Sequence, residues 1–256
     1  SARLNEQQLL WRLQTGHILS PLIPRRSGMR IADLGTGTGH VDPLTPLNLS
    51  HELDTAEICG YDISDLSYPP SATLPTNVKL GKLDALSDLP GEYRGAFDVV
   101  HLRLWICVIR DNCPDKLVEL MEMQEPGGYI QWEKIGRDTS LVTSSPMQRL
   151  ESLYSRQLER ERIDPSWVGR LPDIFRDKGF DVLQDKLGLW DRTVRGLYYA
   201  NYLIVVMSVM RSRYGDSKEK STDLESIARE LFDQRDVDHG FAWRPIELVA
   251  QKAKRA

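Results

Sequence analysis

The sequence predicts an α/β fold in which a doubly wound, largely parallel sheet is flanked by helices. Short apolar runs without strict alternation recur at intervals of roughly 20 to 30 residues in the first half of the chain. The segments between them are long enough for crossover helices, and a glycine-rich turn directly follows the first run. A chain of 256 residues can bury the core of one large domain.

The first element that we expect is an amphipathic helix over residues 5–19, "NEQQLLWRLQTGHIL". Its leucines Leu9, Leu10 and Leu13, followed by Ile18, come close to helical spacing. The segment "SPLIPRRSG" then ends the helix. We expect residues 1–27 to form a cover helix over a bound ligand, although packing on the sheet edge or against a second copy fits the same pattern.

Seven apolar runs are expected to form the strands of the sheet. They lie at residues 29–34, 56–62, 78–84, 97–103, 128–133, 180–190 and 243–253. Beyond residue 140 the pattern changes to long helical stretches, at residues 144–163, 166–179, 193–215 and 223–236. We therefore expect one domain with two parts: a ligand-binding core at 28–140, and a helical lid at 141–256 that also carries the strands completing the sheet.

Composition and charge exclude several classes of function. The net charge of -4 disfavours a nucleic-acid partner, which would need a basic surface. No apolar run approaches the ~20 residues of a membrane span, and no signal pattern is present, so a cytoplasmic protein without a membrane partner is expected. The three cysteines lack metal-ligand or redox spacing, and the five histidines are scattered, so no metal is expected.

The glycine-rich turn "ADLGTGTG" points to a ligand with a cationic part. Asp33 ends the first apolar run, and Gly35, Gly37 and Gly39 follow at every second position, where they let the backbone approach a ligand closely. A pyrophosphate loop would place its third glycine one residue later. An acid before the loop would repel a diphosphate and attract a cation.

The chain after the loop is unusual because it contains prolines where a helix is expected. Pro43 and Pro46 in "GHVDPLTPLNLSHELD" delay the predicted helix to Thr45 or Pro46, with Thr45 as N-cap. His40 either points toward the ligand or is an exposed loop histidine.

Two further acids follow the second and third strands. Asp62 lies 23 residues beyond Gly39, where a carboxylate can accept hydrogen bonds from both hydroxyls of a ribose. Asp84 precedes Ala85 and Leu86, a combination that suits an adenine amino group and ring face. Together with Asp33, these acids predict a site for a cationic nucleoside at the ends of three strands.

These residues carry a family resemblance. "ADLGTGTG" with "GYDIS", "LDALSDLP", "FDVVHLR" and "PGGYIQWE" resembles the class I S-adenosylmethionine-dependent methyltransferases. More closely, it is similar to the fungal secondary-metabolism branch that includes the gliotoxin thiomethyltransferase, UMTA-like enzymes and regulator-like proteins. The resemblance implies a Rossmann-like seven-stranded sheet, S-adenosylmethionine as cofactor and S-adenosylhomocysteine as product.

The resemblance also implies roles for individual residues. The loop from Asp33 to Gly39, including Thr36, would pack against the methionine portion of the cofactor, with Asp33 near its ammonium. Asp62 would bind the ribose and Ile63 would cover the adenine. The residues that would meet the adenine edge or line the sulfonium side are Asp84, Ala85, His101, Leu102 and Arg103.

The acceptor is expected to be a small molecule. Methyl transfer from a sulfonium needs positioning more than a protein nucleophile, so a thiol or amine is favoured over a hydroxyl, which usually needs a general base. His101 is the candidate base or orienting group. The aromatic residues expected on the acceptor side are Trp105, Trp190, Tyr198, Tyr199 and Tyr202, with Trp132 near a strand end.

Alternative functions remain open at this point. A regulatory or interaction protein with a methyltransferase fold, or a non-methylating cyclase or rearrangement enzyme, would fit the altered segment after the glycine loop. A nicotinamide-dependent dehydrogenase is disfavoured by the glycine spacing. A homodimer is a candidate assembly.

Overall fold

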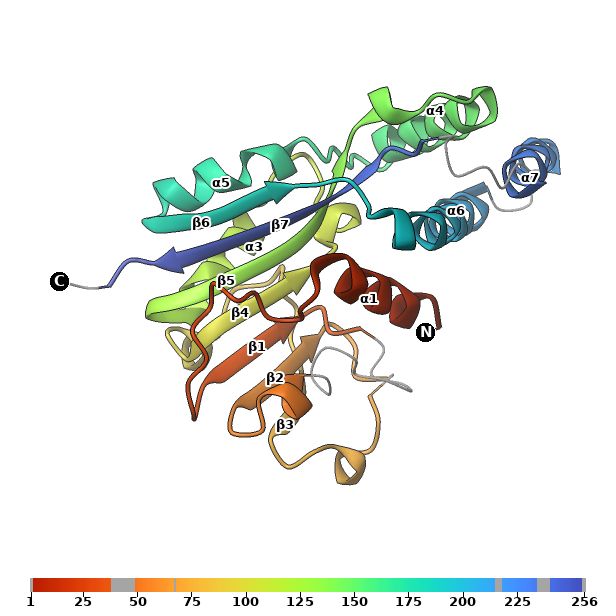
Figure 1. The fold of residues 1–256 in the computed structure, drawn as a ribbon. Helices are drawn as coiled ribbons and strands as arrows, with labels where there is room; N and C mark the ends of the chain where they lie inside the picture. Colours follow the sequence, from red (N-terminus) through yellow and green to blue (C-terminus); the bar gives the residue numbers. More distant parts are fainter. Residues whose placement is uncertain (1, 38–48, 67, 215–217, 234–239, 255–256) are drawn as a thin grey trace.

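The computed structural model describes residues 2–37, 49–66, 68–214, 218–233 and 240–254. Its centre is one seven-stranded sheet with the strand order β3-β2-β1-β4-β5-β7-β6 (Figure 1). The strands are β1 (Arg30–Leu34), β2 (Glu57–Asp62), β3 (Val78–Lys82), β4 (Phe97–Arg103), β5 (Gln124–Arg137), β6 (Phe180–Leu187) and β7 (Trp243–Lys252). All seven predicted strands are confirmed.

The sheet is mixed. Strands β1 to β5 pair in parallel, whereas β7 is antiparallel to both of its neighbours, β5 and β6. The carboxyl ends of the parallel strands therefore meet at one edge, where open α/β sheets bind their ligands. This is the doubly wound fold that the apolar runs predicted.

The helices are α1 (Ala2–Thr15), α3 (Asp115–Glu119), α4 (Ser145–Arg160), α5 (Trp167–Asp177), α6 (Arg192–Tyr214) and α7 (Lys218–Asp233). Short 3-10 turns are η1 (Ser71–Thr73), η2 (Gly91–Tyr93), η3 (Trp105–Cys107), η4 (Leu120–Met123) and η5 (Thr139–Leu141). The helix start expected near Thr45 lies outside the described residues, and residues 49–52 are helical. No helix in the described part of the chain is long and apolar enough to cross a membrane.

The two faces of the sheet are covered differently. On one face, Leu34, Leu102 and Trp132 belong to a buried cluster with Trp167 and Phe175 of α5. On the other face, the segment after α1 covers the strands, because Ile18, Leu19 and Ile23 belong to a cluster with Ile31 and Val99. Residues that alternate along one strand thus serve two separate cores.

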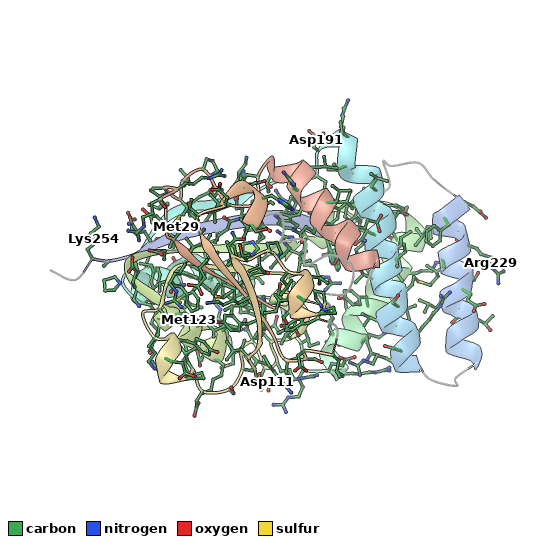
Figure 2. All side chains as sticks on the ribbon, turned by 90° about the horizontal axis from the view of Figure 1, so that it is seen from below. Met29, Asp111, Met123, Asp191, Arg229 and Lys254 are labelled. Atoms are coloured by element: carbon green, nitrogen blue, oxygen red, sulfur yellow. The ribbon has the colours of Figure 1, made fainter. Side chains whose placement is uncertain are left out.

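A third cluster lies beyond the carboxyl edge of the sheet. Helices α4, α6 and α7 gather there, and α1 lies beside α6 in both views (Figures 1 and 2). Helix α1 contributes Leu10 and Trp11, which are buried, whereas Leu9 and Leu13 are more than half exposed. The predicted apolar face of this helix was therefore wrong in detail: the residues packed against α6 are Leu10 and Trp11, and Ile18 lies beyond the helix end.

Candidate functional site

A cavity of about 260 Å³ opens at the carboxyl edge of the sheet. Eight of the residues singled out in the sequence line it: Gly35, Asp62, Ile63, Asp84, Ala85, Leu86, Arg103 and Trp105. They come from the ends of β1, β2 and β4 and from the segment after β3. The sheet topology thus brings together residues that lie up to 70 positions apart in sequence, from Gly35 to Trp105.

Within the described part of the glycine turn, Gly35 lines this cavity, whereas Thr36 and Gly37 do not. Gly35 and Gly37 have positive φ angles of 70° and 80°, which favour glycine. A Cβ atom at Gly35 would lie 2.9 Å from Cζ2 of Trp105, so the indole packs directly on the turn. The backbone amides of Gly35 and Thr36 donate to the carbonyl oxygen of Tyr61 at 2.8 and 3.0 Å. Gly39 and His40 lie outside the described residues.

Asp62 and Asp84 hold the backbone around them as well as facing the cavity. Oδ2 of Asp62 accepts a hydrogen bond from the amide of Gly37 at 2.8 Å, which joins the end of β2 to the glycine turn. Oδ1 of Asp84 accepts from the amide of Leu86 at 2.9 Å. The apolar side chain of Ile63 is 61% exposed beside them. Two carboxylates and an open apolar surface therefore share one cavity.

Asp33 is not among the residues that line the cavity. It lies buried beneath the cavity, where its Oδ1 is 2.6 Å from Nδ1 of His101 on the neighbouring strand β4. The two residues stand opposite each other in the pairing of β1 with β4. Register explains this position, because Asp33 and His101 point to the face of the sheet that the segment after α1 covers.

A buried ionic network continues from this pair. Nε2 of His101 lies 3.6 Å from Oε2 of Glu133, and Nε of Arg103 donates to the same carboxylate oxygen. Burial opposes the charged imidazole, but the carboxylates of Asp33 and Glu133 outweigh it and raise the pKa of His101 to about 9. Burial likewise opposes the charge of Glu133, yet Arg103 and His101 lower its pKa. At neutral pH the network therefore holds two positive and two negative charges.

The network extends toward the segment after α1. Gln131 donates to Oε1 of Glu133 at 3.0 Å and accepts from the amide of Ser20 at 2.7 Å. Across the sheet, Glu133 is paired in register with Glu247, whose Oε1 lies 2.6 Å from Nε2 of His17. The hydrogen bond to Glu247 outweighs burial and raises the pKa of His17.

Sequence reasoning missed Glu133, Gln131, His17 and Glu247. One signal could have found the first two: in "GYIQWE" the polar residues alternate with apolar ones, which is unexpected for a strand buried on both faces. His17 and Glu247 are 230 positions apart and carry no local signal.

The predicted aromatic residues separate into two groups. Trp105 lines the cavity, whereas Trp190, Tyr198 and Tyr202 are buried in the cluster with α1 and do not line it. Tyr199 is half-buried and packs on Phe241, with ring centroids 5.8 Å apart. Leu102 is fully buried in the core and also does not line the cavity. These positions follow from the packing of α6. The ring of Tyr198 packs on Trp11 of α1, and the ring of Tyr202 packs on Trp243 at the amino end of β7.

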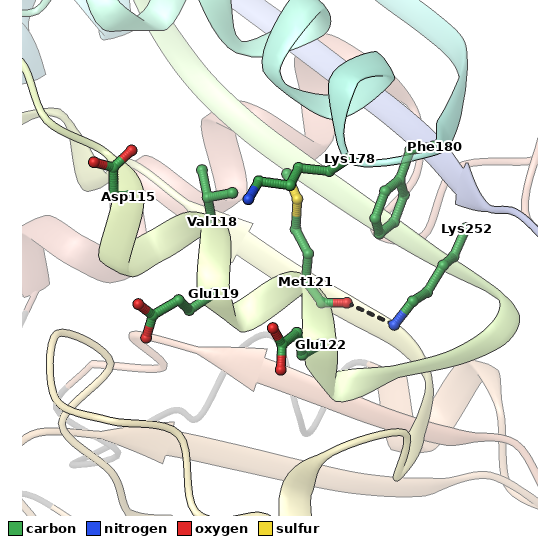
Figure 3. A pocket seen from close by; sticks show the side chains of 8 residues that line it. All are labelled: Asp115, Val118, Glu119, Met121, Glu122, Lys178, Phe180 and Lys252. Carbon is green, nitrogen blue, oxygen red and sulfur yellow. Dashed lines mark hydrogen bonds between the residues drawn. The ribbon is translucent and has the colours of Figure 1, made fainter.

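A second cavity, of about 270 Å³, lies at the opposite edge of the sheet (Figure 3). Helix α3, η4 and Lys178 and Lys252 surround it, near the amino end of β5. Three of its polar side chains have partners within the protein: Lys252 donates to the carbonyl oxygens of Met121 and Gln124, Glu119 pairs with Lys116, and Glu122 pairs with Arg94. No cluster of metal-ligating side chains occurs within the described ranges.

Curated relatives were found by sequence. The chain is 27% identical to the methyltransferase grgD of a Penicillium species over 176 residues, which cover 64% of this chain and 59% of that protein. It is 28% identical to the N-methyltransferase gliN of Aspergillus fumigatus over 196 residues, 72% of this chain and 66% of that protein. It is 41% identical to the N-methyltransferase verN of Clonostachys rogersoniana over 80 residues, 29% of this chain and 26% of that protein. The chain thus matches less than two thirds of each of these relatives, and no family model matches it.

Solved structures share the fold. The [4+2]-cyclase SpnF superposes with a TM-score of 0.57 at 17% identity, covering 99% of this chain and 82% of that one. A phosphoethanolamine N-methyltransferase of Haemonchus contortus, in complex with phosphomonomethylethanolamine and S-adenosylhomocysteine, gives the same TM-score at 16% identity, covering 98% of this chain and 53% of that one. The sheet is therefore the Rossmann-like sheet of class I methyltransferases.

Proposed function

We propose that this protein is an S-adenosylmethionine-dependent methyltransferase that acts on a nitrogen atom of a small molecule. The observation that carries the proposal is the cavity at the carboxyl edge, where Asp62 and Asp84 lie beside Gly35 and the apolar residues Ile63 and Ala85. Fungal relatives named as methyltransferases support it, and they favour the fungal small-molecule branch of the family.

The residues present fit this cofactor. Asp62 and Asp84 offer carboxylate oxygens to ribose hydroxyls and to an adenine amino group, while Ile63 and Ala85 offer apolar contact to the ring. The positive φ at Gly35 allows close approach to the turn, and Asp33 adds a negative charge beneath it. When bound, S-adenosylmethionine supplies a methyl group activated on a sulfonium.

The ionic network restricts the kind of acceptor. His101 holds its proton at neutral pH because its pKa is raised to about 9, so it cannot serve there as a general base. Its role in this proposal is to hold Asp33 in place, as the 2.6 Å contact indicates. An acceptor without a protein base is better suited to be an amine or a thiol than a hydroxyl. Two of the relatives described above are named N-methyltransferases, which favours nitrogen.

The helices at the carboxyl edge are proposed to form the lid over the acceptor. Helices α1 and α6 lie side by side there, and α4 and α7 extend the same layer (Figure 1). In such an arrangement the core at 28–140 binds the cofactor and the later helices exclude water from the reacting groups.

Calorimetric titration with S-adenosylmethionine and transfer of a labelled methyl group test the proposal. We expect saturable binding of the cofactor, and label in small molecules when the protein is incubated with a fungal metabolite extract. Absence of cofactor binding at millimolar concentration would contradict the proposal. Cofactor binding without transfer of label would favour a regulatory protein, and product formation without cofactor would favour a cyclase.

A further inference from the structure

The hydroxyl oxygen of Tyr198 on α6 is buried in a position that packing does not explain. Its side chain is completely buried, and its hydroxyl has no hydrogen-bond partner among the described residues. A buried hydroxyl without a partner destabilises the folded state, whereas phenylalanine would fill the same space without that cost. The hydroxyl therefore calls for a hydrogen-bond partner that the described residues do not supply.

Burial raises the pKa of the Tyr198 phenol and the charge of Arg103 acts against it, so Tyr198 lies near a residue that lines the cavity. Its ring stacks on Trp190 with centroids 3.3 Å apart and meets the edge of Trp11 at 6.3 Å. Leu104 packs against this aromatic cluster and also lines the cavity. Within the described part of the chain, Leu104 is the one residue that both packs against this cluster and lines the cavity.

Leu104 is itself held in an unusual conformation. Its φ of 56° and ψ of 43° are left-handed, which is rare for leucine, and its amide donates to the carbonyl oxygen of Glu133 at 3.0 Å. Such backbone strain is concentrated at functional sites. The Leu104 side chain is thus placed by the same residue, Glu133, that anchors the ionic network.

The groups near Tyr198 indicate the chemistry that a hydrogen-bond partner of its hydroxyl must have. Burial raises the pKa of the Tyr198 phenol well above its usual value, so the phenol keeps its proton and acts as a donor. The indole Nε1 of Trp105, in the cavity wall, is a second buried donor without a partner in the described ranges. The nearby charge of Arg103 is already balanced by Glu133. Two neutral donors and aromatic walls match an uncharged ligand with accepting oxygens.

We propose that Tyr198 donates a hydrogen bond to the methyl acceptor when the Leu104 side chain moves aside, and that the acceptor is a flat, uncharged molecule with a carbonyl group beside its reacting nitrogen. This inference rests on the proposed function and adds the class of substrate to it. Tyr198 is then a residue that determines specificity rather than a part of the core alone.

Binding of three matched compounds tests the inference. Anthranilamide has a flat ring, an amine and a neutral carbonyl group beside it; anthranilate replaces the amide by a carboxylate; aniline has no carbonyl group. Dissociation constants are measured by ligand-observed NMR in the presence of saturating S-adenosylhomocysteine. We expect the unmodified protein to bind anthranilamide at least about tenfold more tightly than either of the other two, because only anthranilamide is both neutral and an acceptor.

The variant Tyr198→Phe separates recognition from packing. It is expected to weaken anthranilamide binding about tenfold, to leave aniline binding unchanged, and to keep or raise the urea midpoint of unfolding. The control is Tyr202→Phe, one turn further along α6, where the hydroxyl donates to the buried Glu151. That variant should lower the urea midpoint and leave anthranilamide binding unchanged.

The outcomes discriminate clearly. Equal binding of anthranilamide by the unmodified protein and Tyr198→Phe, preference for anthranilate, or no binding of anthranilamide would each overturn the inference. Calorimetry with S-adenosylhomocysteine on the same samples reports separately on the proposed function, since cofactor binding does not depend on Tyr198. Loss of cofactor binding in the unmodified protein would therefore count against the function, and loss of the anthranilamide preference alone against the substrate class.

Discussion

Nδ1 of His101 lies 2.6 Å from Oδ1 of Asp33, and both side chains are buried across the pairing of β1 with β4. This contact ties the end of the strand that precedes the glycine turn to the strand that carries Arg103. Because Glu133 approaches the other ring nitrogen, the imidazole is held between two carboxylates.

Because His101 is charged in the folded protein, the free energy of unfolding should fall as the pH rises into the alkaline range. Its pKa rises from 6.5 to about 9 on folding, so its contribution is complete below pH 6.5 and is lost as the pH rises through 9. On the order of 2 to 3 kcal/mol should be lost over that window. Urea unfolding at pH 6, 7.5 and 9.5 measures the loss, and His101→Gln should flatten the curve. The exposed His51 provides a control, since His51→Gln should leave the slope intact.

The contribution of Lys134 to the free energy of unfolding should have the opposite pH dependence and become more favourable as the pH rises. Its ammonium is buried, donates to the carbonyl oxygen of Val168 at 3.2 Å and lies 3.9 Å from Asp185. Burial lowers its pKa from 10.5 to about 8, so its charge destabilises the fold below pH 8, and this penalty disappears as the pH rises to 10.5.

Lys134→Met should therefore raise the free energy of unfolding at pH 7 by about 1 to 3 kcal/mol. The gain should vanish near pH 10.5, as measured by urea unfolding at both pH values. The exposed Lys186 on β6 is the control, because Lys186→Met should change stability at neither pH. A loss of stability in Lys134→Met at pH 7 would show that its hydrogen bond to Val168 outweighs the burial of its charge.

Asp62→Asn should weaken binding of S-adenosylmethionine. The substitution removes the negative charge that faces the cavity while keeping an oxygen for the amide of Gly37. Loss of charge-assisted hydrogen bonds to the ribose should weaken binding about 10- to 100-fold in calorimetric titrations. Asp65→Asn, an exposed change three residues away, should bind as tightly as the unmodified protein. Equal affinity in the two variants would place the nucleoside elsewhere.

Gly35→Ala should impair both stability and cofactor binding. The added Cβ would lie 2.9 Å from the Trp105 ring at a φ of 70°, so the indole must move and the backbone is strained. The expected cost is about 1 to 2 kcal/mol in unfolding free energy, together with a change in tryptophan fluorescence. Gly169→Ala serves as the control, because that site in α5 has open space around its Cβ position and alanine favours helices. If Gly35→Ala kept full stability and affinity, the close packing of Trp105 on the turn would be irrelevant to the site.

The sequence predicted the strands well because burial on both faces leaves a local signal of apolar runs. It also predicted that Asp62, Asp84 and Arg103 would meet, since carboxyl ends of parallel strands share an edge. It did not reveal that Asp33 is buried opposite His101, because the direction of a side chain at a strand end depends on register. It did not reveal that Trp190 and Tyr198 are buried, since spacing near α6 does not show that α1, almost 180 positions earlier, packs on them.

The position of β7 between β5 and β6 constrains how the chain can acquire its structure. Among the described strands, β6 pairs with β7 alone, which follows it by more than 50 residues. During synthesis, β6 therefore has no partner strand until α6, α7 and β7 have left the ribosome. Until then the edges of β5 and β6 are open to pairing with other chains, so the last step of folding is also the one most exposed to aggregation.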